Sequence, residues 1–443
     1  MSGSTGEVRP DAIERLIEQG GLAPRQFLII LICMLLNLSD GFDVMSWAFT
    51  ADRVGNALGL GPEQLGAVAS AALAGMMLGA MVLAPLSDLF GRRRLILISV
   101  SGIAVAMFFT ASVSNLTQLL VLRFVAGLGV GAILASLAAI ASEFAPEKYK
   151  SLAVVSITLG YPLGAMFAGM IASQILPVYD WPAMYYGGAA VNVLLVLLVW
   201  LYIPESMQYL VRKRPENALH RINQTLALIN RPSLSQLPAY EEPEHRSGTL
   251  LHNMLALLAP RFRRQTITLW LTFFFCFICL YFLLSWIPKM LIDAGFAEQQ
   301  SLMGGTAFNL GAFFGVLAVG FLATRFSLSS IIGLFLALSG LLMIVYAVAP
   351  AEFNLLLTII FVIGILQQGG FTGLYAVAAK VYSSDIKATG IGWAIGLGRF
   401  GAVVGPYMAG VMIAGGATMQ LNFTIFAVPM ILGGVLAWSL KVK

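Results

Sequence analysis

Charged residues are scarce in this sequence, because only 11% of its 443 residues are Asp, Glu, Lys or Arg. Soluble domains carry about 25%. Hydrophobic residues make up 59% of the chain, and its mean hydropathy is +0.86. A soluble core could not absorb so much apolar surface, so the composition excludes a soluble protein. It predicts an all-α polytopic membrane protein, in which each membrane-spanning helix needs about 20 apolar residues.

Cysteine is also rare, with three residues in the chain. Cys276 and Cys279 form a CxxC, but they lie inside the apolar run LTFFFCFICLYFLL. A redox or metal-binding CxxC requires an accessible turn and polar neighbours. We therefore expect these thiols, like Cys33, to face lipid or the protein core, and we predict neither a metal nor a cofactor.

Long polar segments are nearly absent, and the one clear exception divides the chain. Polar residues fill positions 204–264, and residues 1–25 form a short polar stretch that we interpret as a cytosolic N-terminal tail. The predicted organisation is this tail, an N-terminal six-helix bundle over 26–203, a cytosolic linker over 204–264, a C-terminal bundle over 265–440 and a cytosolic tail over 441–443. The apolar windows that predict the twelve helices are 26–50, 63–86, 95–114, 117–141, 151–175, 183–203, 265–288, 301–323, 328–349, 353–379, 388–413 and 419–440.

Basic residues indicate the orientation. Of the 26 Lys and Arg residues, Arg123 and Arg399 fall within predicted spans, and only Arg53 and Lys289 fall on the side that we assign as external. The others lie in the tails, the linker and the connections on the linker side. Because positive residues concentrate on the cytoplasmic side, both termini are predicted to be cytoplasmic. The basic residues alternate with spans instead of forming one patch, so the formal charge of +5 is no sign of a nucleic-acid partner.

A weak internal repeat relates the two halves. PLSDLFGRRR (85–94) corresponds to FLATRFSLSS (321–330), and SEFAPEKYKS (142–151) corresponds to AKVYSSDIKA (379–388). Each segment follows an even-numbered span of its half. The repeat predicts two six-helix bundles related by an axis along the membrane normal, with a binding site near the bilayer midplane between them.

Four charged residues interrupt the apolar windows: Asp40 and Asp43 in the first, Arg123 in the fourth and Arg399 in the eleventh. A charge at the bilayer centre costs roughly 2.5–3.5 kcal/mol on insertion scales, so such residues normally face an internal cavity. All three histidines lie in the linker, which leaves Asp40 and Asp43 as the deep groups able to carry a proton. The alternative is that one aspartate only pairs within the helix or caps a kink at Gly41.

The two arginines supply fixed positive charge, one in each half. A guanidinium stays protonated and binds a carboxylate bidentately, which suits an organic acid. We hypothesise that Arg399 binds the substrate carboxylate, and that Arg123 pairs with Asp40 or Asp43 and responds to protonation. The alternative is that both arginines only neutralise aspartates.

Aromatic and amide residues could complete the pocket, since a flat ring stacks on aromatic side chains and accepts hydrogen bonds from amides. Each of them could equally serve helix packing. The candidates are Asn37, Trp47, Tyr161, Tyr281, Trp286, Asn309, Gln367, Gln368 and Trp393.

Several motifs resemble the major facilitator superfamily. DLFGRRR (88–94) is similar to its loop signature, and supporting marks are Arg123 at the start of RFVAGLGVGA and the EFAPE segment (143–147). Within the superfamily the chain looks like the aromatic acid:proton symporters, through DGFD (40–43), LSWIP (284–288) and GLGRFG (396–401). Two departures are Leu89, where arginine is usual, and Thr324, where aspartate is usual in the second-half copy.

The resemblance implies a twelve-helix transporter of the bacterial inner membrane, not an enzyme, that works by alternating access. It implies proton-coupled import of small organic acids such as benzoates or hydroxybenzoates, with ring-opened, muconate-like dicarboxylates as an alternative. A monomer is the expected state. Asp88, Gly91, Arg92 and Glu143 lie at cytosolic helix ends, where we expect them to form a gate. Thr324, with no Gly-Arg pair after it, implies that the gating interactions of the C-terminal half are weaker or different in kind.

Two rival functions remain open at this stage. A drug or cation antiporter would require acidic residues exposed in the cavity without arginines paired to them. The presence of Arg123 and Arg399 therefore argues against this function. A membrane enzyme or receptor is disfavoured because the spans show no metal-ligand cluster, nucleophile–base pair or cofactor loop, and the linker is too short for a catalytic domain.

Overall fold

The computed structural model describes residues 12–18, 21–238, 257–382 and 387–440. Parts of three expectations lie outside these residues. They are the beginning of the N-terminal tail, the linker residues 239–256 with His245 and His252, and the C-terminal tail over 441–443.

Twelve helices in the described residues are long and apolar enough to cross a membrane, as the sequence predicted. The N-terminal six are α2 (Pro24–Leu58), α3 (Pro62–Leu78, continued by shorter turns to Phe90), α5 (Arg92–Thr110), α6 (Leu116–Phe144), α7 (Glu147–Tyr179) and α8 (Pro182–Tyr202). The C-terminal six are α12 (Arg263–Asp293), α13 (Glu298–Leu322), α14 (Leu328–Val348), α15 (Phe353–Val381), α16 (Lys387–Ala414) and α17 (Met419–Ser439). No strand occurs among the described residues.

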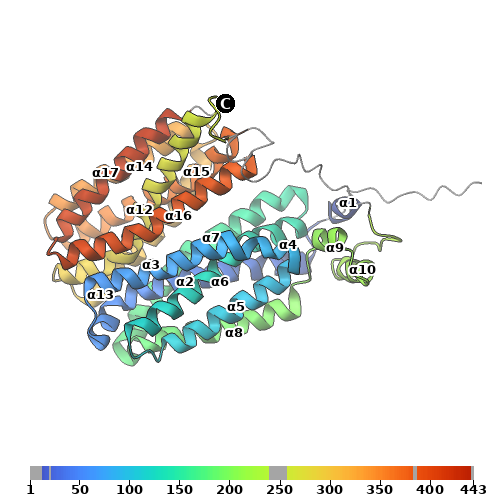
Figure 1. Ribbon diagram of the computed structural model, residues 1–443, viewed down its shortest axis with the longest axis horizontal. Helices are drawn as coiled ribbons and strands as arrows, with labels where there is room; N and C mark the ends of the chain where they lie inside the picture. Colours follow the sequence, from blue (N-terminus) through green and yellow to red (C-terminus); the bar gives the residue numbers. More distant parts are fainter. Residues whose placement is uncertain (1–11, 19–20, 239–256, 383–386, 441–443) are drawn as a thin grey trace, which may run out of the picture.

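The helices form two bundles, α2 to α8 and α12 to α17, which lie side by side in Figure 1. Corresponding helices pack alike in both bundles. The first and fifth spans pair as α2 with α7 and α12 with α16, the second and fourth as α3 with α6 and α13 with α15, and the third and sixth as α5 with α8 and α14 with α17. The two halves that repeat weakly in sequence thus also share one helix arrangement.

Small residues allow the closest helix contacts. A Cβ atom on Gly164 of α7 would lie 1.8 Å from the carbonyl oxygen of Leu38 on α2, and one on Gly131 of α6 would lie 2.0 Å from that of Met76 on α3. Lipid gives no hydrophobic drive between helices, so membrane helices associate through close packing at such small residues. These contacts fix α2, which carries both aspartates, against α7.

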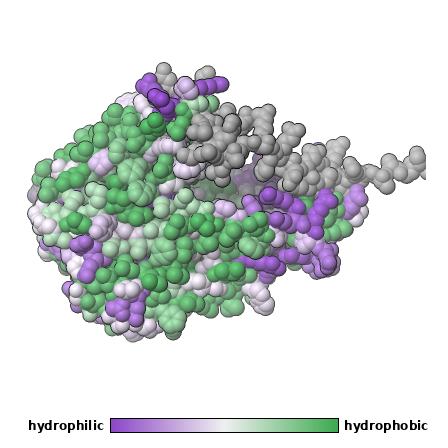
Figure 2. All heavy atoms as spheres, in the orientation of Figure 1, coloured by the Kyte–Doolittle hydropathy of each residue, from purple (hydrophilic) through white to green (hydrophobic). Residues whose placement is uncertain are grey.

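The outer surface matches a membrane environment. Large apolar side chains are exposed along many spans, including Ile98, Leu152, Trp200 and Val435. Figure 2 shows hydrophobic residues covering most of the visible side of the molecule, with hydrophilic residues gathered mainly near its ends. A soluble monomer rarely exposes contiguous apolar surface on this scale.

Short helices mark one end of the molecule, which we call the linker end. The linker helices α9 (Met207–Lys213) and α10 (Ala218–Leu228) lie there with α1 (Ala12–Glu18) (Figure 1). On α1, Ile13 and Ile17 are buried. The opposite end of the bundles is called the far end below.

The two bundles meet mainly toward the far end. Ser70 Oγ donates a hydrogen bond of 2.6 Å to the carbonyl oxygen of Val403, joining α3 to α16. A Cβ atom on Gly66 would lie 2.7 Å from the carbonyl oxygen of Pro406 in the same contact. Toward the linker end the bundles diverge (Figure 1), and the surface between them is hollowed (Figure 2).

Candidate substrate and proton site

Arg123 and Asp43 form an ion pair inside the N-terminal bundle. Arg123 Nη1 lies 2.7 Å from Asp43 Oδ1, and both side chains are only 2% exposed. Arg123 Nη2 also donates to the carbonyl oxygen of Asp43 at 3.3 Å. Of the two partners predicted for Arg123, the structure therefore places Asp43 against it.

Asp40 lies one helical turn before Asp43 on α2 and is equally buried. Its Oδ2 atom is buried and has no hydrogen-bond partner among the described residues. Within the same bundle, Asp40 interacts electrostatically with the hydroxyl of Tyr161 on α7. Asp40 can thus accept or release a proton without breaking an ion pair, whereas Asp43 would have to give up Arg123.

Arg399 brings the two bundles' polar groups together. The half-buried Arg399 on α16 interacts electrostatically with the hydroxyls of Tyr281 and Tyr375 in its own bundle. It also interacts with Tyr161 of the N-terminal bundle. Arg399 Nε is buried without a hydrogen-bond partner among the described residues, and the buried Tyr161 hydroxyl lies next to that of Tyr281 from the other bundle.

The result is an arrangement of opposite charges across the interface. The guanidinium from α16 lies near Tyr161, whose hydroxyl also neighbours Tyr281 and the unpaired acid Asp40. Buried polar groups normally have hydrogen-bond partners, so several orphaned atoms around one point suggest a place for a polar ligand. A carboxylate there could accept hydrogen bonds from Arg399 and the tyrosine hydroxyls.

The amide candidates divide into two kinds. Asn37 Nδ2 donates to the carbonyl oxygen of Ile157 at 2.6 Å, and Asn309 Nδ2 donates to Gly305 of its own helix at 2.9 Å. Their NH2 groups are thus already used in helix contacts. Gln367 donates to the carbonyl oxygen of Cys276 at 3.2 Å, but its buried Oε1 has no partner. The structure leaves Gln368 half-buried next to it.

The tryptophan candidates lie in different surroundings. Trp286 Nε1 donates to the carbonyl oxygen of Pro406 at 3.0 Å, about two helical turns from Arg399 toward the far end. Trp47 is buried in the core. Trp393 is half-buried, with its ring centroid 6.2 Å from that of Trp270.

The predicted gate residues lie at the linker end within the N-terminal bundle. The span that begins with α3 breaks near Pro85 into short turns and ends at Gly91, whose φ of +101° suits glycine. A Cβ atom on Gly91 would also lie 2.4 Å from Glu205 Oε2 and would have to displace that carboxylate. Arg92 forms an ion pair with Glu143, while Asp88 is exposed.

Sequence reasoning missed two members of this cluster. Glu205 accepts a hydrogen bond of 3.0 Å from the backbone nitrogen of Arg93, and Ser206 Oγ donates to Glu143 at 2.9 Å. Both residues follow α8 directly, in Pro204-Glu205-Ser206. An acid placed immediately after a span, beside basic loops on the same side, was the available signal.

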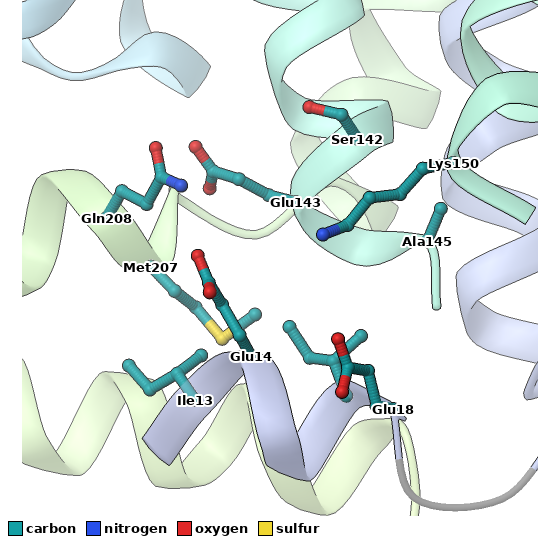
Figure 3. Close-up of a pocket in the computed structure, with 10 residues that line it drawn as sticks. Ile13, Glu14, Glu18, Ser142, Glu143, Ala145, Lys150, Met207 and Gln208 are labelled. Atoms are coloured by element: carbon teal, nitrogen blue, oxygen red, sulfur yellow. The ribbon is translucent and has the colours of Figure 1, made fainter. Parts of the chain in front are cut away.

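A surface pocket of about 120 Å³ borders the gate (Figure 3). Its walls come from α1, the junction of α6 and α7, and α9, and they include Glu14, Glu18, Glu143 and Lys150. Of the predicted site residues, Glu143 alone lines it. All its walls belong to the N-terminal bundle and its adjoining helices, so this pocket is separate from the Arg399 cluster.

Ion pairs between the bundles close the far end, and we call them the cross-bundle ion pairs. Arg53 of α2 binds Glu298 of α13 through Nε and Nη2 at 2.5 and 2.7 Å. Lys289 of α12 lies 3.0 Å from Asp52 of α2. These are the two basic residues that the sequence assigned to the external side, and their acidic partners were not predicted.

Arg53 also binds Asp180, within its own bundle, at 2.9 Å. The hydrogen bond from the Arg53 guanidinium is the main cause that lowers the pKa of Asp180, which lies between α7 and α8. Asp180 thereby holds the arginine in position to reach Glu298. The far end is thus joined by two three-member networks: Arg53 with Glu298 and Asp180, and Lys289 with Asp52 and Asp293.

Comparison with known proteins gives consistent matches. The Major Facilitator Superfamily sequence profile matches residues 32–327 and 269–443. The chain is 30% identical over 423 residues to the 4-hydroxybenzoate transporter PcaK of Pseudomonas putida, covering 96% of this chain and 94% of the relative. It is 28% identical over 425 residues to the gallate transporter of Pseudomonas putida, covering 95% and 93%.

A solved structure supports the fold. The crystal structure of a D-xylose-proton symporter superposes with a TM-score of 0.72 at 16% identity, covering 93% of this chain and 97% of the other. At that identity the likeness concerns the fold alone. Together with the sequence matches, it establishes that the chain belongs to the Major Facilitator Superfamily, as a non-enzymatic membrane transporter in the branch that contains aromatic acid transporters.

Proposed function

We propose that this protein is a proton-coupled symporter that imports small aromatic carboxylates by alternating access. Its relatives include transporters named for 4-hydroxybenzoate, gallate and benzoate. Those names place aromatic acids first among the substrates to test.

One observation carries the proposal: Arg399 and the unpaired acid Asp40 approach the same buried tyrosine, Tyr161, from opposite bundles. In the proposed mechanism Arg399 binds the substrate carboxylate through charge-assisted hydrogen bonds. Asp40 takes up the coupled proton, and Tyr161 links the two sites. Asp43 stays paired with Arg123 and holds α2 in register.

The conformational cycle follows from how the bundles touch. With the linker in the cytoplasm, the far end is external, as the distribution of basic residues indicates. The described arrangement is then closed outside and open inside. Import requires the cross-bundle ion pairs to separate and the linker ends to come together, where Arg92 and Glu143 lie on the N-terminal side.

Proton coupling also suits the energetics. A monoanion that enters a cell with a negative interior climbs about 2.3 kcal/mol per 100 mV. One co-transported proton cancels this penalty and leaves the pH gradient as the driving force, and a second proton lets the membrane potential contribute.

Uptake into proteoliposomes with an imposed pH gradient tests the proposal. We expect accumulation of labelled 4-hydroxybenzoate when the outside is acidic, and collapse of that accumulation when a protonophore is added. Competition with benzoate, gallate, muconate and an organic cation defines the substrate class. Accumulation that ignores the pH gradient, or that only the cation inhibits, would overturn the proposal.

Asp40→Asn separates coupling from binding. We expect this variant to exchange substrate across the membrane but to lose concentrative uptake, because no unpaired acid remains to carry the proton. Glu216→Gln is the matched control, since Glu216 is an exposed linker acid. Full pH-driven accumulation by the Asp40→Asn variant would exclude Asp40 as the proton carrier.

A further inference from the structure

Helix α12 carries aromatic side chains toward two different neighbours. Phe282 stacks on Phe426 of α17, with ring centroids 3.9 Å apart, and Phe423 also contacts Phe282. With Tyr346, these rings form what we call the α17-facing cluster. Its four members are at most 2% exposed, so the cluster is fully occupied by packing.

The second group is the α15-facing cluster: Phe273, Phe277, Tyr281, Phe371 and Tyr375. The three α12 members are four residues apart, so they share one helix face. Phe371 meets Phe277 edge-to-face at 4.9 Å, and Tyr375 meets Phe273 at 5.4 Å. Such edge-to-face pairs are a favoured aromatic geometry.

Two properties distinguish the α15-facing cluster. First, it has an outer layer: Phe371 and Tyr375 are half-buried, whereas Phe273 and Phe277 behind them are at most 2% exposed. Second, it adjoins the fixed charge of Arg399, which interacts with the hydroxyls of Tyr281 and Tyr375. The α17-facing cluster has neither property.

A ligand that combines a carboxylate with a ring fits this juxtaposition. Its carboxylate would lie on Arg399, and a ring bonded directly to that carboxylate would then lie near the guanidinium. The partly open rings of Phe371 and Tyr375 offer apolar surface in the same cluster. A flat aromatic ring gains edge-to-face or offset contacts with them that a puckered, saturated ring does not.

We propose that Phe371 and Tyr375 form the ring subsite of the transporter and make it select aromatic acids over saturated-ring acids of equal charge. This inference rests on the proposed function and adds the residues that determine specificity. Sequence reasoning named Tyr281 but neither Phe371 nor Tyr375, because the subsite depends on the contact between α12 and α15.

Competition in proteoliposomes tests the subsite. Benzoate and cyclohexanecarboxylate are compared as inhibitors of labelled 4-hydroxybenzoate uptake, and the ratio of their half-inhibitory concentrations is the readout. Because the ratio is internal to each variant, differences in expression cancel. In the wild type we expect benzoate to be the stronger inhibitor by about twofold to tenfold, the range of one aromatic contact.

Phe371→Leu and Tyr375→Leu should each bring this ratio close to one, while Tyr375→Phe, which keeps the ring, should preserve it. Phe423→Leu in the α17-facing cluster is the matched control and should leave the ratio unchanged. An unchanged ratio in both leucine variants, or equal inhibition by the two acids in the wild type, would overturn the subsite and leave the proposed function standing. Absence of any aromatic acid uptake by the wild type would overturn both.

Discussion

Arg123 and Asp43 neutralise each other at 2.7 Å inside the N-terminal bundle, while Asp40, one turn away on the same helix, keeps an oxygen without a partner. Two acids that look equivalent in the sequence thus have different surroundings. One is held in a buried ion pair, and the other lies near Tyr161 at the interface between the bundles. We propose that the first is structural and the second carries the proton.

The buried pair should show strong coupling in a double-mutant cycle. Removing one partner of a buried ion pair typically costs about 3–5 kcal/mol, because the other charge stays buried without compensation. We therefore expect Asp43→Asn and Arg123→Gln each to lower the melting temperature in detergent substantially, and the double variant to lose much less than the sum. The partly exposed pair Glu147–Lys150 serves as the control, and strictly additive losses at Asp43 and Arg123 would contradict the pairing.

Arg399 should determine affinity. Truncating one partner of a buried charge pair costs about 2–5 kcal/mol in binding, so Arg399→Ala should raise the KM for 4-hydroxybenzoate at least about thirtyfold. Arg399→Lys keeps the charge but loses bidentate geometry and should recover affinity only in part. Arg325→Ala, at an exposed arginine of the C-terminal bundle, is the comparison variant. A KM unaffected by Arg399→Ala would remove Arg399 from the substrate site.

The cross-bundle ion pairs should set how readily the far end opens. Partly exposed ion pairs contribute about 0.2–1 kcal/mol each, so Glu298→Gln with Asp52→Asn should increase the open population roughly twofold to thirtyfold. Ser70 bonds to Val403 across the interface between the bundles, so a cysteine introduced by Ser70→Cys can serve as a reporter. A larger open population would appear as faster modification of this cysteine by a membrane-impermeant thiol reagent. The native cysteines are buried, which keeps the background low.

Lys150→Gln removes an ion pair within a single bundle and provides the control for that experiment. It should leave the modification rate of the reporter unchanged. If Glu298→Gln with Asp52→Asn also leaves the rate unchanged, the ion pairs do not restrain the far end.

Close packing of α7 on α2 should be sensitive to a single methyl group. A Cβ atom on Gly164 would lie 1.8 Å from a backbone oxygen of α2, so Gly164→Ala must push α2 away and disturb Asp40 and Asp43. We expect lower thermal stability and a marked loss of uptake. Gly102→Ala meets no atom within 4 Å and should be neutral or slightly stabilising, by up to about 1 kcal/mol of helix propensity. Equal behaviour of the two variants would contradict this account.

Much of the fold was predictable from the pattern of residues. Span number, bundle organisation and repeat follow from hydropathy and motif spacing, because lipid forces the backbone to satisfy its hydrogen bonds within helices. The helices extend beyond several predicted windows: α2 runs to Leu58, whereas the window ended at 50. Those last turns carry Asp52 and Arg53, polar residues that end a hydropathy window but not a helix.

The candidate site was only partly predictable. Its charged members were found because a charge in an apolar span is conspicuous. Trp286 and Asn309 were equally conspicuous, yet their polar nitrogens bond to backbone carbonyls. Phe371, Tyr375 and Glu298 were missed, since nothing in their local sequence separates them from ordinary core or loop residues. Glu205 was missed although its place directly after a span was a usable signal.

Sequence by itself determined that this chain crosses a membrane twelve times, that it repeats, and that four charges lie within its spans. These properties depend on composition and residue order alone. They can be recognised in the sequence because placing a charge in hydrocarbon is costly, so a charge within an apolar span is rare. Only tertiary structure decided which aspartate is paired, which tyrosines approach Arg399 and which end of the molecule is closed. Those outcomes depend on how helices distant in the chain pack together. A local sequence pattern does not determine distances of a few ångströms between such helices.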